Sequence, residues 1–134
     1  MECHIHSEFS QVKNVSERLY QFAKMEHIDE MLLGQLELLL VEAVNNVIEH
    51  AYRNQAGHPI YITFTKSATE IIFMIKDQGR PLPDDLSTRN KEMPNATSLP
   101  EGGWGLSLIY ALANRVEFSR QNETNTLTLV KTLN

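Results

Sequence analysis

The stretch DEMLLGQLELLLVEAVNNVIEHAYR, residues 29–53, predicts a long amphipathic helix, and this helix decides the kind of fold. Asp29 suits the N-cap position because its carboxylate can accept hydrogen bonds from the first backbone N–H groups of a helix. Apolar residues recur at helical spacing and predict the side that faces the core: Leu32, Leu36, Leu39, Leu40, Ala43 and Val47. We therefore expect a helix that begins after Asp29, runs to about Arg53 and buries one side.

Shorter elements on both sides of this helix complete the prediction. Residues Glu2–Phe9 alternate between apolar and polar side chains, as in a half-exposed strand, and the residues from Val12 to Glu26 have helical spacing. The later segments are predicted as a strand pair, a helix and a closing strand pair: Ile60–Lys66, Ile71–Lys76, Ser107–Arg115, Val116–Arg120 and Thr126–Leu133. This order predicts an α/β (α+β) two-layer sandwich with helices on one face of a mixed, mostly antiparallel sheet.

Length and composition limit the classes of function. A chain of 134 residues, 42% of them hydrophobic, fits a single domain, which we expect to span residues 1–134. The net charge of −5 gives no electrostatic footprint for nucleic acid. Cys3 is the only cysteine, which excludes an internal disulfide and a cysteine-based zinc cluster. Without a signal-peptide pattern or a long apolar run, the sequence predicts a cytoplasmic protein with no membrane partner.

The second half of the long helix carries a line of polar residues. Glu42, Asn46, Glu49 and Arg53 stand at positions i, i+4, i+7 and i+11, beside the apolar side. A glutamate and an asparagine so placed could orient an attacking hydroxyl and hold Mg²⁺, because Mg²⁺ prefers oxygen ligands and keeps several waters. The alternative is an ordinary solvated helix face, and His50 alone is more typical of a packing residue or a cap.

Asp77 stands where a predicted strand ends, and the residues Gln78-Gly79-Arg80-Pro81 follow it. A carboxylate at a strand end can accept a hydrogen bond from an exocyclic amine such as that of adenine. Gly79 would let the backbone approach a flat base closely. The alternative is a common Asp-x-Gly turn.

Three glycines precede the third predicted helix, in the segment Glu101-Gly102-Gly103-Trp104-Gly105-Leu106. Backbone N–H groups at a helix start, together with the helix dipole, form a cradle for phosphate. The segment lacks the Gly-Lys-Ser/Thr of a Walker loop. The alternatives are a flexible hinge at the start of a helix and, for Trp104, a packing role in place of one covering the site.

Taken in order, these three segments resemble the N, G1 and G2 boxes of the GHKL ATPase superfamily. The matching segments are 42–50 (EAVNNVIEH), 77–81 (DQGRP) and 102–106 (GGWGL). Within the superfamily, the chain is most similar to the small anti-sigma factor serine/threonine kinases of bacteria, in length and along nearly its whole span. The resemblance implies the Bergerat ATP-binding fold.

The resemblance also implies roles for single residues. Asn46 would be the Mg²⁺ ligand, Glu42 the catalytic base and Asp77 the adenine reader, with Gly79 beneath the base. Gly103 and Gly105 would bind phosphate, and Thr126 would assist Asp77 from the last strands. The other residues of the boxes expected at the ATP site are Glu49, His50, Pro81, Gly102, Trp104 and Leu106. The implied substrate is a serine or threonine of an anti-anti-sigma protein of the STAS fold, and the implied further partners are a sigma factor and a second copy of the chain.

Two departures from the family pattern leave a second interpretation open. Arg80 and Pro81 stand where the G1 box commonly has another glycine, and Glu101 stands where some relatives have an arginine suited to the γ-phosphate. Arg80, Arg89 or Lys91 could take the place of that arginine. The alternatives to a kinase are a non-catalytic ATP-binding switch that sequesters a partner and an interaction domain without nucleotide.

Overall fold

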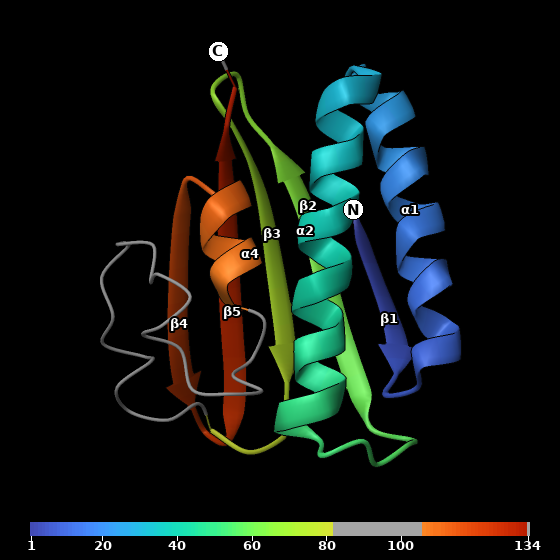
Figure 1. Ribbon diagram of the computed structural model, residues 1–134, viewed down its shortest axis with the longest axis vertical. Coiled ribbons are helices and arrows are strands. Elements are labelled where there is room, and N and C mark those ends of the chain that lie inside the picture. The colour runs from blue at the N-terminus through green and yellow to red at the C-terminus, as the bar shows by residue number, and fades with distance from the viewer. Residues whose placement is uncertain (82–105, 134) are drawn as a thin grey trace.

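The computed structural model describes residues 1–81 and 106–133, and it shows two layers (Figure 1). The helices lie together on one face of a single sheet. The elements in chain order are β1 (Glu2–His6), the 3-10 turn η1 (Phe9–Gln11), α1 (Val12–Met25), α2 (Glu30–Asn46), the π-helical turn η2 (Val47–Ala51), β2 (Pro59–Lys66), β3 (Glu70–Asp77), α4 (Leu106–Leu112), β4 (Arg115–Gln121) and β5 (Thr124–Thr132). The predicted α+β two-layer sandwich is confirmed.

The described strands form one five-stranded sheet in the order β1-β2-β3-β5-β4. Every neighbouring pair is antiparallel, so the mixed sheet that we allowed for is wholly antiparallel in the described part of the chain. The register places Asp77, the last residue of β3, opposite Asn125 near the start of β5. The central strand β3 therefore ends beside the first residues of β5.

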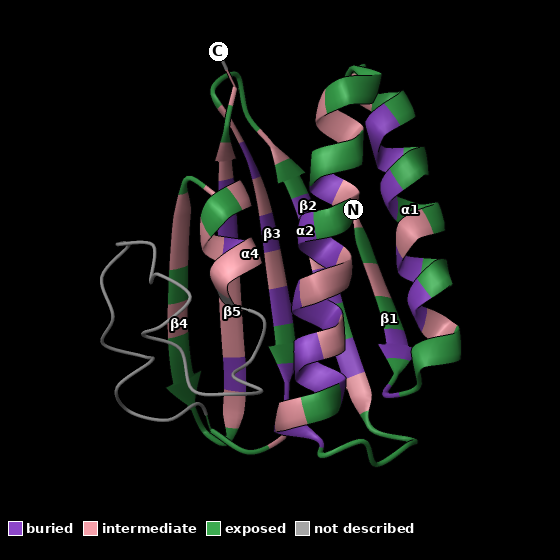
Figure 2. Cartoon of the chain, in the orientation of Figure 1, coloured by how far each residue is buried: buried purple, intermediate pink, exposed green. Residues whose placement is uncertain are grey.

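The long helix forms as the sequence predicts. The Asp29 side chain accepts a hydrogen bond from the backbone N–H of Leu32 at 2.9 Å, which makes it the N-cap of α2. The predicted stripe is buried from Leu36 onward, whereas Leu32 is only partly buried (Figure 2). By length and composition alone the helix Glu30–Ala51 could cross a membrane. Its buried residues instead belong to the same apolar core as those of α1 and the sheet.

Three predicted boundaries are wrong. The third predicted helix, expected to run through Arg115, ends at Leu112, and Arg115 begins β4. Strand β1 ends at His6, and Phe9 lies in the following 3-10 turn with 49% of its surface exposed. The long helix ends at Ala51 through the π-helical turn η2, and Arg53 lies beyond it with a left-handed φ of 52°. Because a π turn holds more residues than an α turn, the regular i, i+4 spacing stops after Asn46. Arg53 therefore does not continue the polar line of Glu42 and Asn46.

Candidate functional site

Three elements bring the candidate residues together at one end of the molecule. The end of α2 with η2, the last residue of β3 and the start of β5 all lie at the lower end in Figure 1. The bond from the backbone N–H of Arg80 to the carbonyl of Ala51, at 2.8 Å, joins the turn after β3 to the end of η2. The N-box helix and the G1 turn therefore form one continuous structure.

Asp77 is a buried carboxylate, with 4% of its surface exposed. Its Oδ1 accepts hydrogen bonds from the backbone N–H of Gly79 and from Nδ2 of Asn125, both at 2.8 Å. Burial raises the pKa of Asp77 above its ordinary value, while these two hydrogen bonds and the charge of Arg120 oppose that rise. A carboxyl group whose pKa is raised by burial and which is held by specific partners is typical of a functional site.

Asn125 is a site residue that the sequence interpretation missed. Its side chain is buried beside Asp77, and it also donates to the carbonyl of Arg80 at 2.8 Å. The signal was present in β5, because Asn125 precedes Leu127 and Leu129 at alternate positions, on the face that the core covers. A polar residue in such a series needs a partner, and here the partner is Asp77.

Thr126, which we expected to assist Asp77, lies elsewhere. The register of β3 and β5 places it opposite Lys76, so its side chain belongs to the other face of the sheet from Asp77. The expectation is corrected by one residue: Asn125 is the neighbour of Asp77 on β5.

Gly79 has a packing reason to be glycine. A β-carbon at this position would lie 2.4 Å from the carbonyl oxygen of Ala51 and 2.8 Å from its β-carbon. The preceding residue is held as well, because the backbone N–H of Gln78 donates to the hydroxyl of Tyr52 at 2.7 Å. The turn after β3 is therefore fixed against the end of η2 by close backbone contact.

Asn46 lies on the last turn of α2 and is 5% exposed. Its Nδ2 has no hydrogen-bond partner among the described residues. Rotation of the amide by 180° exchanges its oxygen and nitrogen, so the unpaired position can present either atom. A buried amide nitrogen without a partner costs about 1–3 kcal/mol, whereas in the rotated orientation the amide oxygen would occupy the same position and could coordinate a cation that keeps ligand waters. The residue therefore fits the predicted Mg²⁺ ligand.

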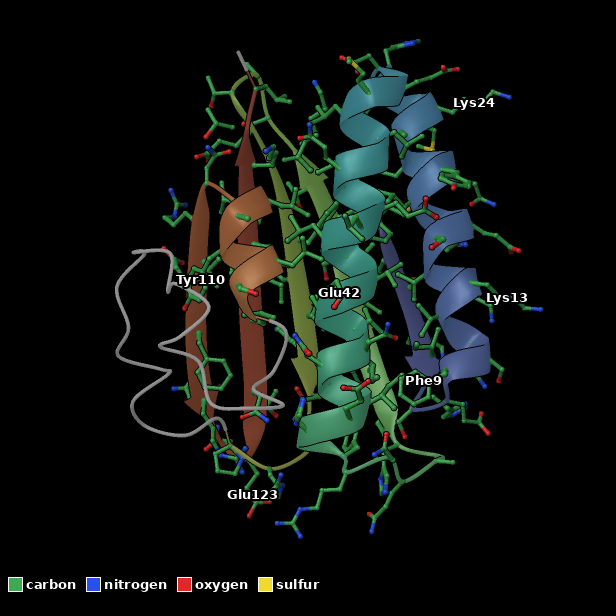
Figure 3. The ribbon with its side chains drawn as sticks, viewed as in Figure 1. Phe9, Lys13, Lys24, Glu42, Tyr110 and Glu123 are labelled. Carbon is green, nitrogen blue, oxygen red and sulfur yellow. The ribbon has the colours of Figure 1, made fainter. Side chains whose placement is uncertain are left out.

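Glu42 lies one helical turn before Asn46, on the same side of α2 and partly buried. Figure 3 labels it on α2, in the layer of helices. In the part of the chain that the structure describes, no group of three His, Cys, Asp or Glu side chains could hold a metal ion. A metal at Asn46 would accordingly depend on few protein ligands, which suits Mg²⁺ with a phosphate ligand.

The remaining box residues surround this end of the helix. Glu49 is exposed and lies 3.6 Å from Nε2 of His50, measured from its Oε2. The carbonyl of His50 accepts from the Nε and Nη2 atoms of Arg80 at 3.2 and 3.0 Å, and Pro81 is exposed. Four predicted residues lie outside the described residues: Gly102, Gly103, Trp104 and Gly105. Leu106 begins α4.

Comparison with known proteins identifies the class. Residues 5–131 match the model of the histidine kinase-like ATPase domain, and the chain belongs to this family. The predicted resemblance to GHKL ATPases is thereby confirmed, and membership implies that the chain binds ATP.

Curated relatives indicate which kinds of proteins within the family are similar to this chain. The chain is 29% identical over 94 residues to an anti-sigma F factor of Oceanobacillus iheyensis, covering 70% of this chain and 64% of the relative. It is 32% identical to the serine-protein kinase RsbW of the same organism, covering 66% and 59%, and 32% identical to the serine/threonine-protein kinase BtrW of Bordetella bronchiseptica, covering 70% and 66%. The match thus spans slightly less than two thirds of these relatives' lengths.

Solved structures share the fold. The RsbU and RsbW domains of a Mycobacterium tuberculosis protein align with a TM-score of 0.63 and 16% identity, covering 98% of this chain and 32% of that one. The catalytic domain of the histidine kinase ThkA aligns with a TM-score of 0.58 and 14% identity, covering 98% and 95%. The SiaB-SiaC complex from Pseudomonas aeruginosa aligns with a TM-score of 0.62 and 10% identity, covering 98% of this chain and 89% of that one.

Proposed function

We propose that this chain is an ATP- and Mg²⁺-dependent serine/threonine protein kinase of a bacterial partner-switching system. The observation that carries the proposal is the pair Glu42 and Asn46, one turn apart on α2. The Asn46 side chain is buried at the end that also holds Asp77, and its Nδ2 has no hydrogen-bond partner among residues 1–81 and 106–133. Relatives named serine-protein kinase and serine/threonine-protein kinase support it.

The described residues suit the binding of Mg-ATP. Asp77 would accept a hydrogen bond from the exocyclic amine of adenine, and the oxygen of the Asn46 amide would coordinate Mg²⁺. The bound Mg²⁺ would neutralise charge on the phosphates, which is most of what phosphoryl transfer requires of a site. Gly103 and Gly105 are proposed as phosphate-binding residues.

Glu42 distinguishes a kinase from a protein that only binds nucleotide. Its carboxylate would accept a hydrogen bond from the substrate hydroxyl and take the proton as the hydroxyl oxygen bonds to the γ-phosphorus of ATP. The bond from that phosphorus to the β,γ-bridging oxygen breaks, and ADP is the leaving group. A positioned base of this kind contributes typically about 10²–10⁴-fold to the rate. Its place beside Asn46 would put the acceptor hydroxyl next to the metal-bound phosphate.

We propose an anti-anti-sigma protein of the STAS fold as the substrate, because relatives of this chain are named anti-sigma F factor and RsbW. A sigma factor as a second partner, a homodimer and a cytoplasmic location belong to the same proposal. In this proposal the chain binds either the sigma factor or the anti-anti-sigma protein, and phosphorylation of the anti-anti-sigma protein decides which of the two is bound.

One observation favours a second function, a non-catalytic ATP-binding switch that sequesters its partner. The guanidinium of Arg80 donates to the carbonyl of His50 at two atoms, so it is engaged at the end of the helix. Arg80 would have to leave these bonds to reach the γ-phosphate. Arg89 and Lys91, the other candidates, lie outside the described residues.

The test is incubation of the purified chain with γ-labelled ATP, Mg²⁺ and STAS proteins of the same genome. We expect label on a serine or threonine of one of them, and no label when EDTA removes Mg²⁺. ATP binding without transfer to any STAS protein would support the sequestering switch instead. Absence of ATP binding would overturn both functions.

A further inference from the structure

We propose that Asn125 and Arg120 position the Asp77 carboxylate and thereby set the preference of the site for a 6-amino purine over a 6-oxo purine. This inference rests on the proposed binding of ATP at Asp77. The two residues stand directly opposite each other on β5 and β4, and together they are called the Asn125–Arg120 pair.

The orientation of the Asn125 amide is determined by its neighbours. Its Nδ2 donates to Oδ1 of Asp77 and to the carbonyl of Arg80, both at 2.8 Å. Its Oδ1 accepts from Nη1 of Arg120 at 2.8 Å. A guanidinium only donates, whereas an ionised carboxylate and a carbonyl only accept, so a rotated amide would lose all three bonds. Asn125 therefore transmits the position of Arg120 to Asp77.

Arg120 connects the same network to the turn after β3. Its Nη1 also donates to the carbonyl of Gly79 at 3.0 Å. The Asn125–Arg120 pair thus holds the turn at the carbonyls of Gly79 and Arg80. It holds the Asp77 carboxylate through the Asn125 amide. On its other side the turn is held by Ala51.

This network leaves one oxygen of Asp77 for a ligand. Oδ1 accepts from both Gly79 and Asn125, and within the described part of the chain Oδ2 receives no hydrogen bond. An ionised oxygen that can only accept complements the 6-amino group of adenine and repels the 6-oxo group of guanine or hypoxanthine. A site built to bond one exocyclic group rejects analogues that lack it, because a buried polar group is then left unpaired.

The charges around Asp77 agree with this role. The described groups that act on the ionisation of Asp77 are the side chain of Asn125 on β5, the backbone N–H of Gly79 and the Arg120 guanidinium on β4. The Tyr52 hydroxyl lies near them after η2. Burial raises the pKa of Asp77, and Asn125 and Arg120 oppose that rise. Without the pair, the carboxyl would protonate more readily, and a neutral carboxylic acid can donate a hydrogen bond to a 6-oxo group.

The experiment compares dissociation constants of ATP and inosine triphosphate by calorimetry, since the two differ at position 6 of the purine. The wild type should prefer ATP by at least about tenfold. Asn125→Leu should lower this preference by about tenfold or more, because the Asp77 carboxylate loses the side-chain donor that holds it. Arg120→Leu, at an exposed residue, provides the same test if Asn125→Leu does not fold. Arg120→Lys should keep most of the preference for ATP, because an ammonium can also donate to Oδ1 of Asn125 and to the carbonyl of Gly79.

The matched control is Arg115→Leu, since Arg115 lies on the same strand β4 and pairs with Glu117 and Glu70 instead. It should leave the preference for ATP unchanged. If the pair variants weaken ATP and inosine triphosphate equally, the pair is only structural and the inference is overturned while the ATP site stands. If the wild type binds neither nucleotide, the proposed function fails and the inference fails with it.

Discussion

Gly79 lies so close to Ala51 that a β-carbon on residue 79 would be 2.4 Å from the Ala51 carbonyl oxygen. This contact joins the turn that follows Asp77 to the helix end that carries Asn46. The residue proposed to bind the base and the residue proposed to bind the metal are therefore held at a fixed separation. A ligand that bridges them would find both in place before it binds.

Gly79→Ala should destabilise the protein by about 1–3 kcal/mol or more, because the added carbon collides with backbone atoms that cannot move independently. Gly34→Ala is the matched control. Gly34 lies within α2, and a β-carbon there would meet nothing within 4 Å. The control should stabilise the helix by up to about 1 kcal/mol. Urea unfolding of both variants measures the difference, and equal stabilities would contradict the close contact.

Asn46→Leu should lose the Mg²⁺ dependence of ATP binding, with at least about a tenfold fall in affinity, which corresponds to 1.4 kcal/mol. Its stability should equal or exceed that of the wild type, because the substitution removes a buried amide whose nitrogen has no partner in the described part of the chain. Asn45→Leu, at the neighbouring, less buried position, should keep the Mg²⁺ dependence. Titration of ATP with and without Mg²⁺ tests this. A Mg²⁺ response in Asn46→Leu as large as that of the wild type would remove the metal role.

Glu42→Gln should bind Mg-ATP as the wild type does and transfer phosphate about 10²–10⁴ times more slowly, because the amide cannot accept the proton. Single-turnover transfer to the partner protein measures the rate. Glu37→Gln is the control on the same helix, since the described contact of Glu37 is with the hydroxyl of Tyr20 on α1. Equal transfer rates for Glu42→Gln and the control would exclude Glu42 as the base.

The buried Asp77 predicts a pH dependence of stability. Burial raises its pKa above 3.8, so between that value and the folded-state pKa the folded protein binds more protons than the unfolded chain. The free energy of unfolding therefore falls as pH rises through this window, and at neutral pH the full cost of burying the ionised carboxylate is present. Asp77→Asn removes this cost of a buried charge and can keep the bonds from Gly79 and Asn125. Its stability relative to the wild type should increase from acidic to neutral pH, and a decrease over that range would contradict the raised pKa.

The sequence predicted the elements whose signals are local. The N-cap at Asp29 and the apolar stripe of α2 depend on neighbours along one helix, and both are found. The strands also follow from their own alternation, which is why Asp77 was placed correctly at a strand end.

What depends on contacts between distant segments could not be predicted. The choice of Asn125 over Thr126 depends on the register of β5 against β3, and a shift of one residue places a side chain on the other face of the sheet. The π turn η2 lacks a proline or another local signal, so Arg53 was expected on the helix. The contact of Gly79 with Ala51 likewise exists only after α2 has packed on the sheet.

The most direct measurement is the affinity of the purified chain for Mg-ATP, compared with that of Asp77→Asn. If the end of the molecule formed by α2, β3 and β5 is the nucleotide site, the wild type binds ATP saturably and the folded variant binds at least about tenfold more weakly. In Asp77→Asn, an amide that keeps the bonds from Gly79 and Asn125 presents its nitrogen, a donor, where the carboxylate presents an acceptor oxygen. If the folded variant binds ATP as tightly as the wild type, Asp77 does not bind the base and the proposed site is wrong.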